Sequence, residues 1–341
     1  MAPTPASLFF RPLGDQRGMA LLVTLLTVSL LVAVTVQYHK KAWHNLAVSN
    51  TFKESARLQT VAGSGVNIAL ALLAGDTGES DNLTESWATT ASFAGLFPQA
   101  DLELRVIDLS GRLPVNSLVV QPGGGNRTEQ QRIAAAWQEV LLRLLQSGSF
   151  AIEDDNQARA VVDALIDWLD ADEQEMTQGA ESGYYQGLPR PYRSRNGPVD
   201  NLAELLLVKG VTPALLYGEG EQLALVEYLS PYGEEGKINL NTADPLLLQS
   251  LHPEIDADLA AAVDDFRREE QHADLLGELD WYRRVPGWPA GLQLNEKILT
   301  SGSGYFRIEA EATFNRLSGR QVVEVLRKEG GEINFLRKMV E

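Results

Sequence analysis

An uncharged apolar stretch close to the N-terminus, from Met19 to Val36, constrains this chain more than any other feature. It contains no charged residue, no proline and no glycine, and its polar side chains are four hydroxyls that can bond to carbonyls of their own helix. At about 1.5 Å per residue, roughly 18 residues form a helix on the order of 27 Å long, enough to cross bilayer hydrocarbon. The sequence therefore predicts a membrane-inserted helix, or a segment that is removed from the mature protein.

Helical apolar spacing continues beyond this stretch. Lys40 and Lys41 follow the span, and apolar residues then recur among polar ones as far as Leu73. A secretory signal peptide would instead carry a small-residue cleavage site behind its apolar core, and none stands close behind Val36. We expect one continuous helix from about Met19 to about Leu73. An ordinary signal anchor is the alternative interpretation of this segment.

Strand patterns lie at two distant places in the chain. Leu102–Asp108 alternates apolar and polar residues, and Leu113–Asn116 is expected to continue the meander after a turn. One hairpin cannot bury the face of a helix. Further alternating segments follow at 305–314, 321–327 and 332–338. The sequence therefore predicts one antiparallel sheet assembled from both places.

The region between these strands is predicted to be helical. Helical apolar spacing or helix-capping residues mark segments 127–146, 157–169, 201–213, 241–251 and 258–268. The fold class is therefore α+β, with a long N-terminal helix packed on an antiparallel sheet and a large all-α domain inserted between strands.

Arg17-Gly18 followed by Met19-Ala20-Leu21-Leu22 resembles the prepilin-type signal of type IV pilins and type II secretion pseudopilins. The resemblance implies that a prepilin peptidase cleaves after Gly18 and that Met19 is then methylated. Val23 stands where this family usually has a glutamate that is thought to pair with a neighbouring subunit's terminal amine. Its absence fits one minor member, the K pseudopilin, better than a repeating filament subunit.

Blocks along nearly the whole chain extend the resemblance to the K family, among them Asp163–Asp172, Leu205–Gly210 and Ile238–Ala243. It implies a minor pseudopilin at the tip of the pseudopilus with the I and J pseudopilins, helping to initiate and limit assembly for protein export. It also implies a single-pass inner-membrane protein of a Gram-negative bacterium, with its main domain in the periplasm. Lysines after the span favour the opposite orientation by the positive-inside rule, and the resemblance overrules them.

The expected domain organisation follows from this resemblance and from the patterns. It comprises a leader (1–18), the transmembrane and pilin helix (19–74), a first β segment (75–121), an inserted helical domain with two helical-hairpin (SAM-like) units (122–300), and a C-terminal β segment (301–341).

Acidic residues after segment 157–169 suggest a metal site. Asp170, Asp172 and Glu181 stand at positions one, three and twelve of a calcium loop, but Glu175 replaces the glycine that an EF-hand needs. A looser oxygen cage that includes Asp167 and Glu175 remains open, as does a solvated acidic loop. Members of the K family bind calcium in this insert, so the resemblance implies one or two calcium ions here.

Composition argues against other functions. A formal charge of −17 disfavours binding of DNA or anionic lipid through a broad surface, and the absence of cysteine excludes disulfides and thiolate sites. Ile238–Ala243 resembles the entry to a nucleic-acid-binding helix-hairpin-helix, but the following hairpin, Leu251–Asp256, has two acids and no glycine. A membrane-anchored nucleic-acid-binding protein is thus the alternative, and a signal-anchored hydrolase a weaker one. The histidines are spread apart, and we expect no catalysis.

Overall fold

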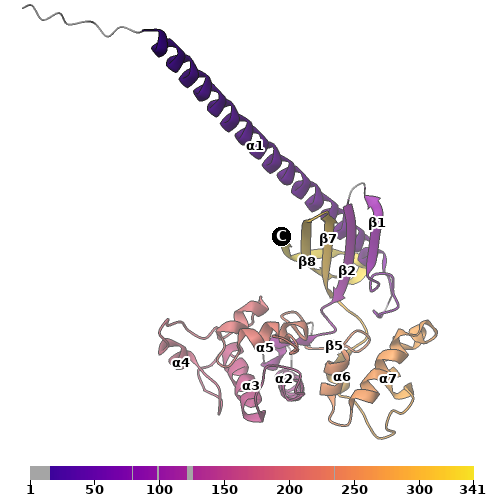
Figure 1. The fold of residues 1–341 in the computed structure, drawn as a ribbon. Helices are drawn as coiled ribbons and strands as arrows, with labels where there is room; N and C mark the ends of the chain where they lie inside the picture. The colour runs from indigo at the N-terminus through magenta and orange to yellow at the C-terminus, as the bar shows by residue number, and fades with distance from the viewer. Residues whose placement is uncertain (1–15, 79, 98–99, 121–125, 234) are drawn as a thin grey trace, which may run out of the picture. The chain divides into compact units, whose positions relative to one another are not determined.

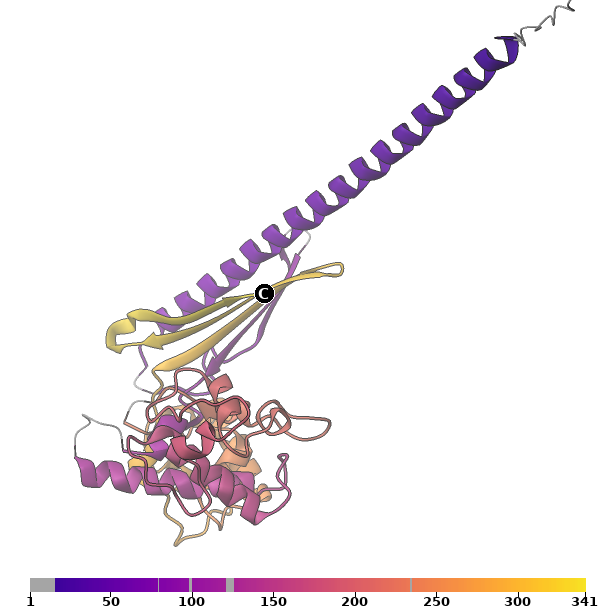
Figure 2. The same cartoon turned by 90° about the vertical axis from the view of Figure 1, so that its left-hand side faces the viewer.

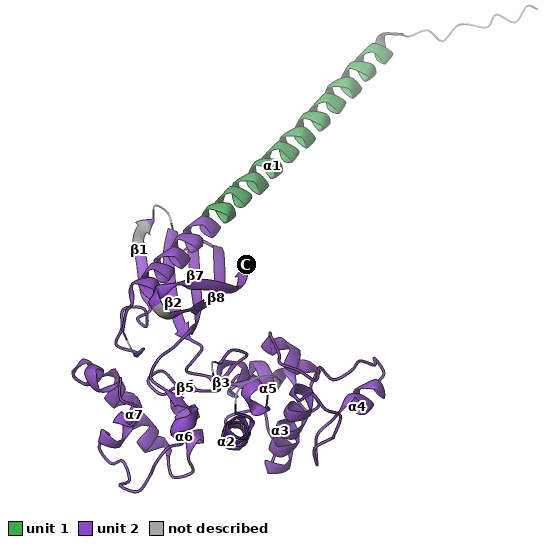
Figure 3. Ribbon diagram, turned by 180° about the vertical axis from the view of Figure 1, so that it is seen from behind, with its two compact units in different colours: residues 1–57 green, residues 58–341 purple. Residues whose placement is uncertain are grey.

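The computed structural model describes residues 16–78, 80–97, 100–120, 126–233 and 235–341, in two compact units, residues 1–57 and 58–341 (Figure 3). Most of the expected leader therefore lies outside the described residues. The helix α1 (Gln16–Gly75) is continuous, which confirms the helix expected from about Met19 to about Leu73. It is long and apolar enough to cross a membrane, by length and composition. In its apolar stretch the hydroxyls of Thr24, Thr27 and Thr35 donate to carbonyls one turn earlier, at 2.7–2.9 Å.

The second unit is built around one five-stranded antiparallel sheet in the order β1-β2-β7-β8-β9 (Figure 1). Its strands are β1 (Ala91–Phe97), β2 (Ala100–Asp108), β7 (Tyr305–Phe314), β8 (Leu317–Arg327) and β9 (Ile333–Val340). The β2–β7 ladder runs without a break from Asp101 opposite Thr313 to Asp108 opposite Phe306. Segments about two hundred residues apart thus share one sheet, which confirms the predicted fold class.

The C-terminal part of α1 packs on one face of this sheet (Figure 2). Its buried side chains meet the inward positions of the strands, and the shared core contains Leu58, Ala62, Ala69, Leu73, Leu102, Leu104, Ile308, Ala310 and Val323. Gly65 lets the helix approach closely, because an added Cβ would lie 2.9 Å from Leu102 Cδ1 and 3.1 Å from Ala310 Cβ.

Between β2 and β7 the chain forms the insert, which has its own hydrophobic core around Trp137, Trp168 and Trp281. Its α-helices are α2 (Arg127–Leu145), α3 (Asp155–Leu169), α4 (Ser182–Gln186), α5 (Pro213–Tyr217), α6 (Pro245–Leu251) and α7 (Ala257–Arg268). Short 3-10 helices are η1 (Val115–Leu118), η2 (Leu202–Leu207), η3 (Leu225–Glu227), η4 (Glu270–Leu275), η5 (Trp281–Arg284) and η6 (Glu296–Ile298), with η7 (Glu329–Gly331) before β9. Two short parallel ladders pair β3 (Leu113–Pro114) with β4 (Leu229–Ser230), and β5 (Ile238–Asn239) with β6 (Leu299–Thr300).

One local expectation needs correction. Leu113–Asn116 does not continue the meander; Leu113–Pro114 pairs with β4 inside the insert, and 3-10 helix follows from Val115. A proline has no N–H to donate to a central ladder, so this segment suits a short edge pairing. Segment 201–213 is helical as expected: η2 comes first, Gly210 with its positive φ makes the turn, and α5 starts at Pro213. The exact domain limits stay predictions.

Candidate metal centre

Three carboxylates converge at the C-terminal end of α3. Asp167, Asp170 and Glu181 each offer one oxygen, and these oxygens all lie within 4.8 Å of one another. Asp167 is fully buried and Glu181 is 6% exposed, while Asp170 is half-buried. These three residues, which we call the carboxylate cluster, are all among those predicted from the sequence.

Local interactions explain why the chain returns to α3 after leaving it. The helix ends at Leu169, and the backbone N–H of Met176 donates to both carboxylate oxygens of Asp167, at 3.1 Å each. Gly179 then passes so close that an added Cβ would lie 1.9 Å from Asp167 Oδ2. Asp167 therefore holds the loop that brings Glu181 back to Asp170.

Contacts from later parts of the insert fix the same loop. The ammonium of Lys209 donates to the carbonyl oxygens of Gly179 (2.7 Å) and Gln178 (3.2 Å). The side-chain amide of Asn196 donates to the carbonyl of Asp172 and to Glu173 Oε1, both at 3.0 Å. The loop is thus tied to the body of the insert rather than projecting freely into solvent.

The charges inside the carboxylate cluster are poorly compensated. Asp170 Oδ1 and Glu181 Oε1 are buried and accept no hydrogen bond from the part of the chain that the structure describes. Burial, with the negative charges of Asp172 and Asp167, raises the pKa of Asp170 to about 6. Burial, with Asp167 and Asp170, raises the pKa of Glu181 to about 7, and burial also raises the pKa of Asp167. Such a group of oxygens is stabilised by protons or by a hard cation.

The other predicted site residues lie outside the carboxylate cluster. Asp172 is exposed, and its Oδ1 accepts the backbone N–H of Gln174 at 2.8 Å. Glu175 is exposed on the same loop. Gly18 and Met19 lie on the exposed part of α1, and a Cβ built on Gly18 would meet nothing within 4 Å beyond its own stretch of helix. The structure therefore brings together three of the five predicted metal ligands.

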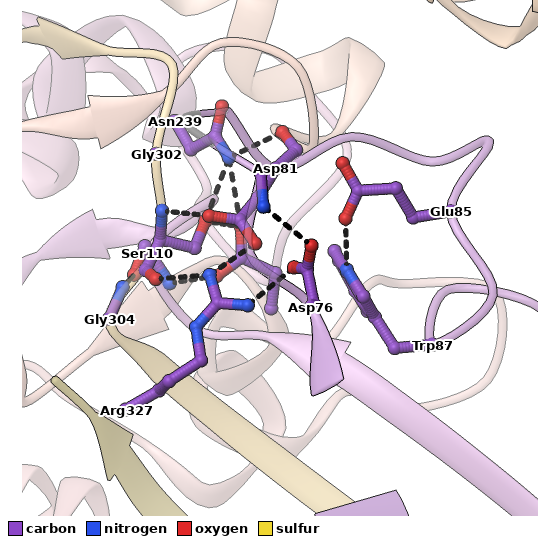
Figure 4. A network of polar contacts seen from close by, with 12 residues as sticks. Asp76, Asp81, Glu85, Trp87, Ser110, Asn239, Gly302, Gly304 and Arg327 are labelled. Atoms are coloured by element: carbon purple, nitrogen blue, oxygen red, sulfur yellow. Dashed lines mark hydrogen bonds and ion pairs between the residues drawn. The ribbon is translucent and has the colours of Figure 1, made fainter. Parts of the chain in front are cut away.

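A second acidic group, Asp76, Asp81 and Glu85, was not predicted from the sequence (Figure 4). Here the chain supplies its own cation: Arg327 on β8 pairs with Asp76 at 2.6 Å and also with Asp81. Burial raises the pKa of Asp81 to about 6 despite the charge of Arg327. A polar loop after a helix gives no signal that a strand residue 251 positions after Asp76 will pair with its acids.

Asp81 also belongs to a polar network that joins the insert to the sheet (Figure 4). Its carbonyl accepts the side-chain amide of Asn239 at 3.0 Å, and the same amide donates to Ser303 Oγ at 2.7 Å. Ser303 Oγ in turn donates to the buried carboxylate of Asp108 at 2.5 Å. Because an unmade bond of a buried polar group costs about 1–3 kcal/mol, the network fixes how the insert attaches.

The predicted hairpin, Leu251–Asp256, joins α6 to α7. Asp256 accepts the backbone N–H of Leu259 at 2.8 Å and so caps α7, and Glu254 is exposed on the turn. The turn residues from His252 to Asp256 include no lysine or arginine. A phosphate would meet acidic side chains at this turn.

Comparisons with known proteins place these features in context. Residues 111–217 match the family model described as type II secretion system (T2SS), protein K. The type II secretion system protein K of Pseudomonas aeruginosa is 26% identical over 341 residues, 95% of this chain and 92% of the relative. That of Aeromonas hydrophila is 27% identical over 339 residues, 93% of this chain and 98% of the relative. That of Klebsiella pneumoniae is 26% identical over 243 residues, with 70% and 71% covered.

A solved structure shares the fold. A chain of the crystal structure of the GspK-GspI-GspJ complex from enterotoxigenic Escherichia coli matches with a TM-score of 0.61 and 18% identity, covering 86% of this chain and 99% of that chain. The family model and the relatives confirm the resemblance that the sequence blocks indicate.

The carboxylate cluster makes the metal-free protein sensitive to pH in a predictable direction. The pKa of Glu181 in the folded chain, about 7, exceeds the ordinary value of 4.5, so the folded state holds its proton more tightly than the unfolded state does. Stability in chelator should therefore fall as pH rises from about 4.5 to about 7, by up to roughly 1.4 kcal/mol per pH unit. Glu181→Gln should remove this part of the decline in thermal unfolding, while Glu221→Gln, an exposed control, should not. Parallel curves for wild type and Glu181→Gln would contradict the assignment.

Proposed function

We propose that this chain, a member of the type II secretion system protein K family, is a minor pseudopilin that assembles with the I and J pseudopilins at the tip of the pseudopilus. It would help to initiate assembly there and limit it, in support of protein export across the outer membrane. The α1 helix would anchor it in the inner membrane, with the sheet and insert in the periplasm. The observation that carries the proposal is the divided sheet, packed on α1 and interrupted by the insert.

The point at which the insert leaves the sheet supports a position of this subunit at the tip of the pseudopilus. The backbone N–H of Leu109, just after β2, donates to the carbonyl of Tyr305 at the start of β7, at 2.8 Å. Just after the end of α1, Asp76 pairs with Arg327 at the same end of the sheet. The insert therefore emerges where α1 terminates. A subunit added beyond that end would meet the bulk of the insert.

The N-terminus supports the same position. Val23 offers no carboxylate to the terminal amine of a neighbouring subunit. A subunit that lacks this charge pair is poorly suited to repeat along a filament but can serve once at its end. We propose that the mature chain begins at Met19 and is methylated there.

We also propose that the carboxylate cluster binds calcium. Calcium takes roughly six to eight oxygen ligands in flexible geometry, whereas magnesium demands a near-ideal octahedron and gives up water reluctantly. Asp167, Asp170 and Glu181 would supply protein oxygens, and their uncompensated charge favours a divalent ion. By neutralising them, the ion would stabilise the loop between α3 and α4.

Processing of the N-terminus can be checked with two glycines of the same helix. When the chain is co-expressed with a prepilin peptidase, we expect intact mass spectrometry to show a product that begins at Met19. Gly18→Val should block this cleavage because the enzyme requires glycine at that position, whereas Gly75→Ala should leave it unchanged. An unprocessed wild-type chain would argue against the pseudopilin assignment.

Assembly is tested by purifying the tagged chain from cells that also make candidate I and J pseudopilins. We expect a complex of all three proteins, with α1 protected from hydrogen exchange relative to the isolated chain. The same tag on an unrelated single-pass protein is the control for co-extraction. Failure to recover either partner, or salt-sensitive recovery of nucleic acid instead, would refute the proposal.

Calcium should raise the thermal stability of the protein. At a free concentration one hundred times the Kd, the gain is about 2.7 kcal/mol, and chelator should reverse it. Asp170→Asn and Glu181→Gln should abolish the response, whereas Glu221→Gln should retain it. Asp172→Asn reports whether that exposed loop acid joins the ligands. An unchanged melting temperature in wild type would exclude the calcium site.

A further inference from the structure

The charge of this chain is distributed very unevenly. Residues 16–57 carry five basic side chains and one acidic one, a formal charge of +4, while the whole chain has −17. No aspartate or glutamate occurs from Gln16 to Lys53, so the first acid of α1 is Glu54. A local cationic segment therefore exists within an acidic protein, although the overall charge disfavours contact of a broad surface with anions.

The cationic part of α1, from Tyr38 to Arg57, follows the apolar stretch and contains four of these five basic residues. Its first part, Tyr38, His39, Lys40, Lys41, Trp43 and His44, we call the collar. All six side chains are exposed, Tyr38 by 74% and Trp43 by 72%. Aromatic and basic residues together at the end of a membrane span are typical of the layer of lipid headgroups, where an amphipathic ring or a long cationic chain reaches both apolar and polar surroundings.

The collar surrounds the helix instead of forming a stripe on it. At about 100° per residue, the positions from Tyr38 to Lys41 already cover most of the circumference, and Trp43 and His44 fill further directions. A partner helix would be met by residues on one face, three or four positions apart. A lipid layer surrounds a spanning helix on all sides. The arrangement of the collar therefore fits lipid better than a single protein neighbour.

Distances along the helix place the collar at the right depth. Trp43 follows Val36 by seven residues, or roughly 10 Å, and each headgroup layer is on the order of 5–8 Å thick. Side chains of a helix lean toward its N-terminus, which on α1 is the side of the apolar stretch. Tyr38, Lys40 and Lys41 lie nearer still. Their polar ends, and the ring of Trp43, would thus lie among the headgroups.

We propose that the collar binds anionic phospholipid headgroups on the membrane face from which α1 emerges. The lysines bind the phosphates, and Tyr38 and Trp43 fix the depth of the helix. This contact would also account for lysines on the side of the span that the positive-inside rule disfavours. The inference rests on the membrane insertion proposed above.

Trp43 makes the proposal directly measurable. Four of the other five tryptophans, Trp87, Trp137, Trp168 and Trp281, are at most 2% exposed, and Trp288 is half-buried in the insert. The full chain is reconstituted in phosphatidylcholine vesicles that contain a small fraction of lipid brominated close to the headgroup. In one set the brominated lipid is phosphatidylglycerol, and in the other, at the same mole fraction, it is phosphatidylcholine. The ratio of the two quenching efficiencies of tryptophan emission reports the preference of the collar for anionic lipid.

We expect brominated phosphatidylglycerol to quench more strongly, with a preference that approaches roughly fivefold for each lysine at low salt and weakens as salt is added. Lys40→Gln combined with Lys41→Gln should bring the ratio close to one. Lys297→Gln combined with Lys328→Gln removes the same charge from exposed lysines of the second unit and should leave the ratio unchanged. Trp43→Phe should remove the lipid-dependent quenching.

Contrary outcomes separate this inference from the proposed function. Equal quenching by both lipids, or a ratio that the collar variants do not alter, overturns the binding of anionic headgroups. Loss of all quenching when I and J pseudopilins are added shows that protein, rather than lipid, covers the collar and also overturns it. Alkaline extraction reports insertion independently: a chain that resists extraction but shows no lipid preference refutes the collar alone, whereas an extractable chain refutes the membrane anchor itself.

Discussion

The pairing of β2 with β7 is the interaction on which the rest of the second unit depends. It joins segments about two hundred residues apart through an uninterrupted ladder and so creates a sheet wide enough to bury the C-terminal part of α1. Without it, β1 and β2 would form a lone hairpin, which is marginally stable in water. The same ladder brings both ends of the insert together. The insert, with its separate hydrophobic core, is therefore attached to the sheet at one end of β2 and β7.

The attachment of the insert to the sheet is polar, whereas the hydrophobic cores of the insert and of the sheet are apolar. Asn239, Ser303 and Asp108 form a chain of buried hydrogen bonds, and Arg327 ties the loop after α1 to β8. Hydrophobic contact is non-directional and would allow the insert several orientations on the sheet, whereas buried polar groups lose free energy whenever their partners shift. The network thereby gives a defined direction to the insert, as its proposed role at the end of a filament requires.

Two acidic groups in the same unit show how differently the chain treats buried negative charge. Around Asp76 and Asp81 it supplies the guanidinium of Arg327, which pairs with both carboxylates and compensates their charge in part. Around Asp170 and Glu181 the described residues supply backbone donors to Asp167 but no cationic side chain, and they leave one oxygen of Asp170 and one of Glu181 without a donor. The first group contains structural ion pairs, and the second is the group for which we propose a cation. The collar on α1 shows the opposite arrangement: its lysines are exposed, and no acidic residue occurs near them in the sequence.

Local patterns in the sequence determined much of this protein. The apolar stretch predicted α1, and alternation predicted β2 and β7. Capping residues predicted α3, and a helical pattern predicted α7. The crowding of acids after α3 gave five candidate ligands that include Asp167, Asp170 and Glu181. These features depend on near neighbours in the chain, so a short window of residues contains their cause.

Only the tertiary structure decided which distant groups meet. It moved Leu113–Pro114 from the expected meander into the insert, paired Arg327 with Asp76, and left Asp172 and Glu175 outside the carboxylate cluster. Strand partners and charge partners are chosen by three-dimensional packing between segments far apart in sequence, and no periodicity within either segment encodes the other.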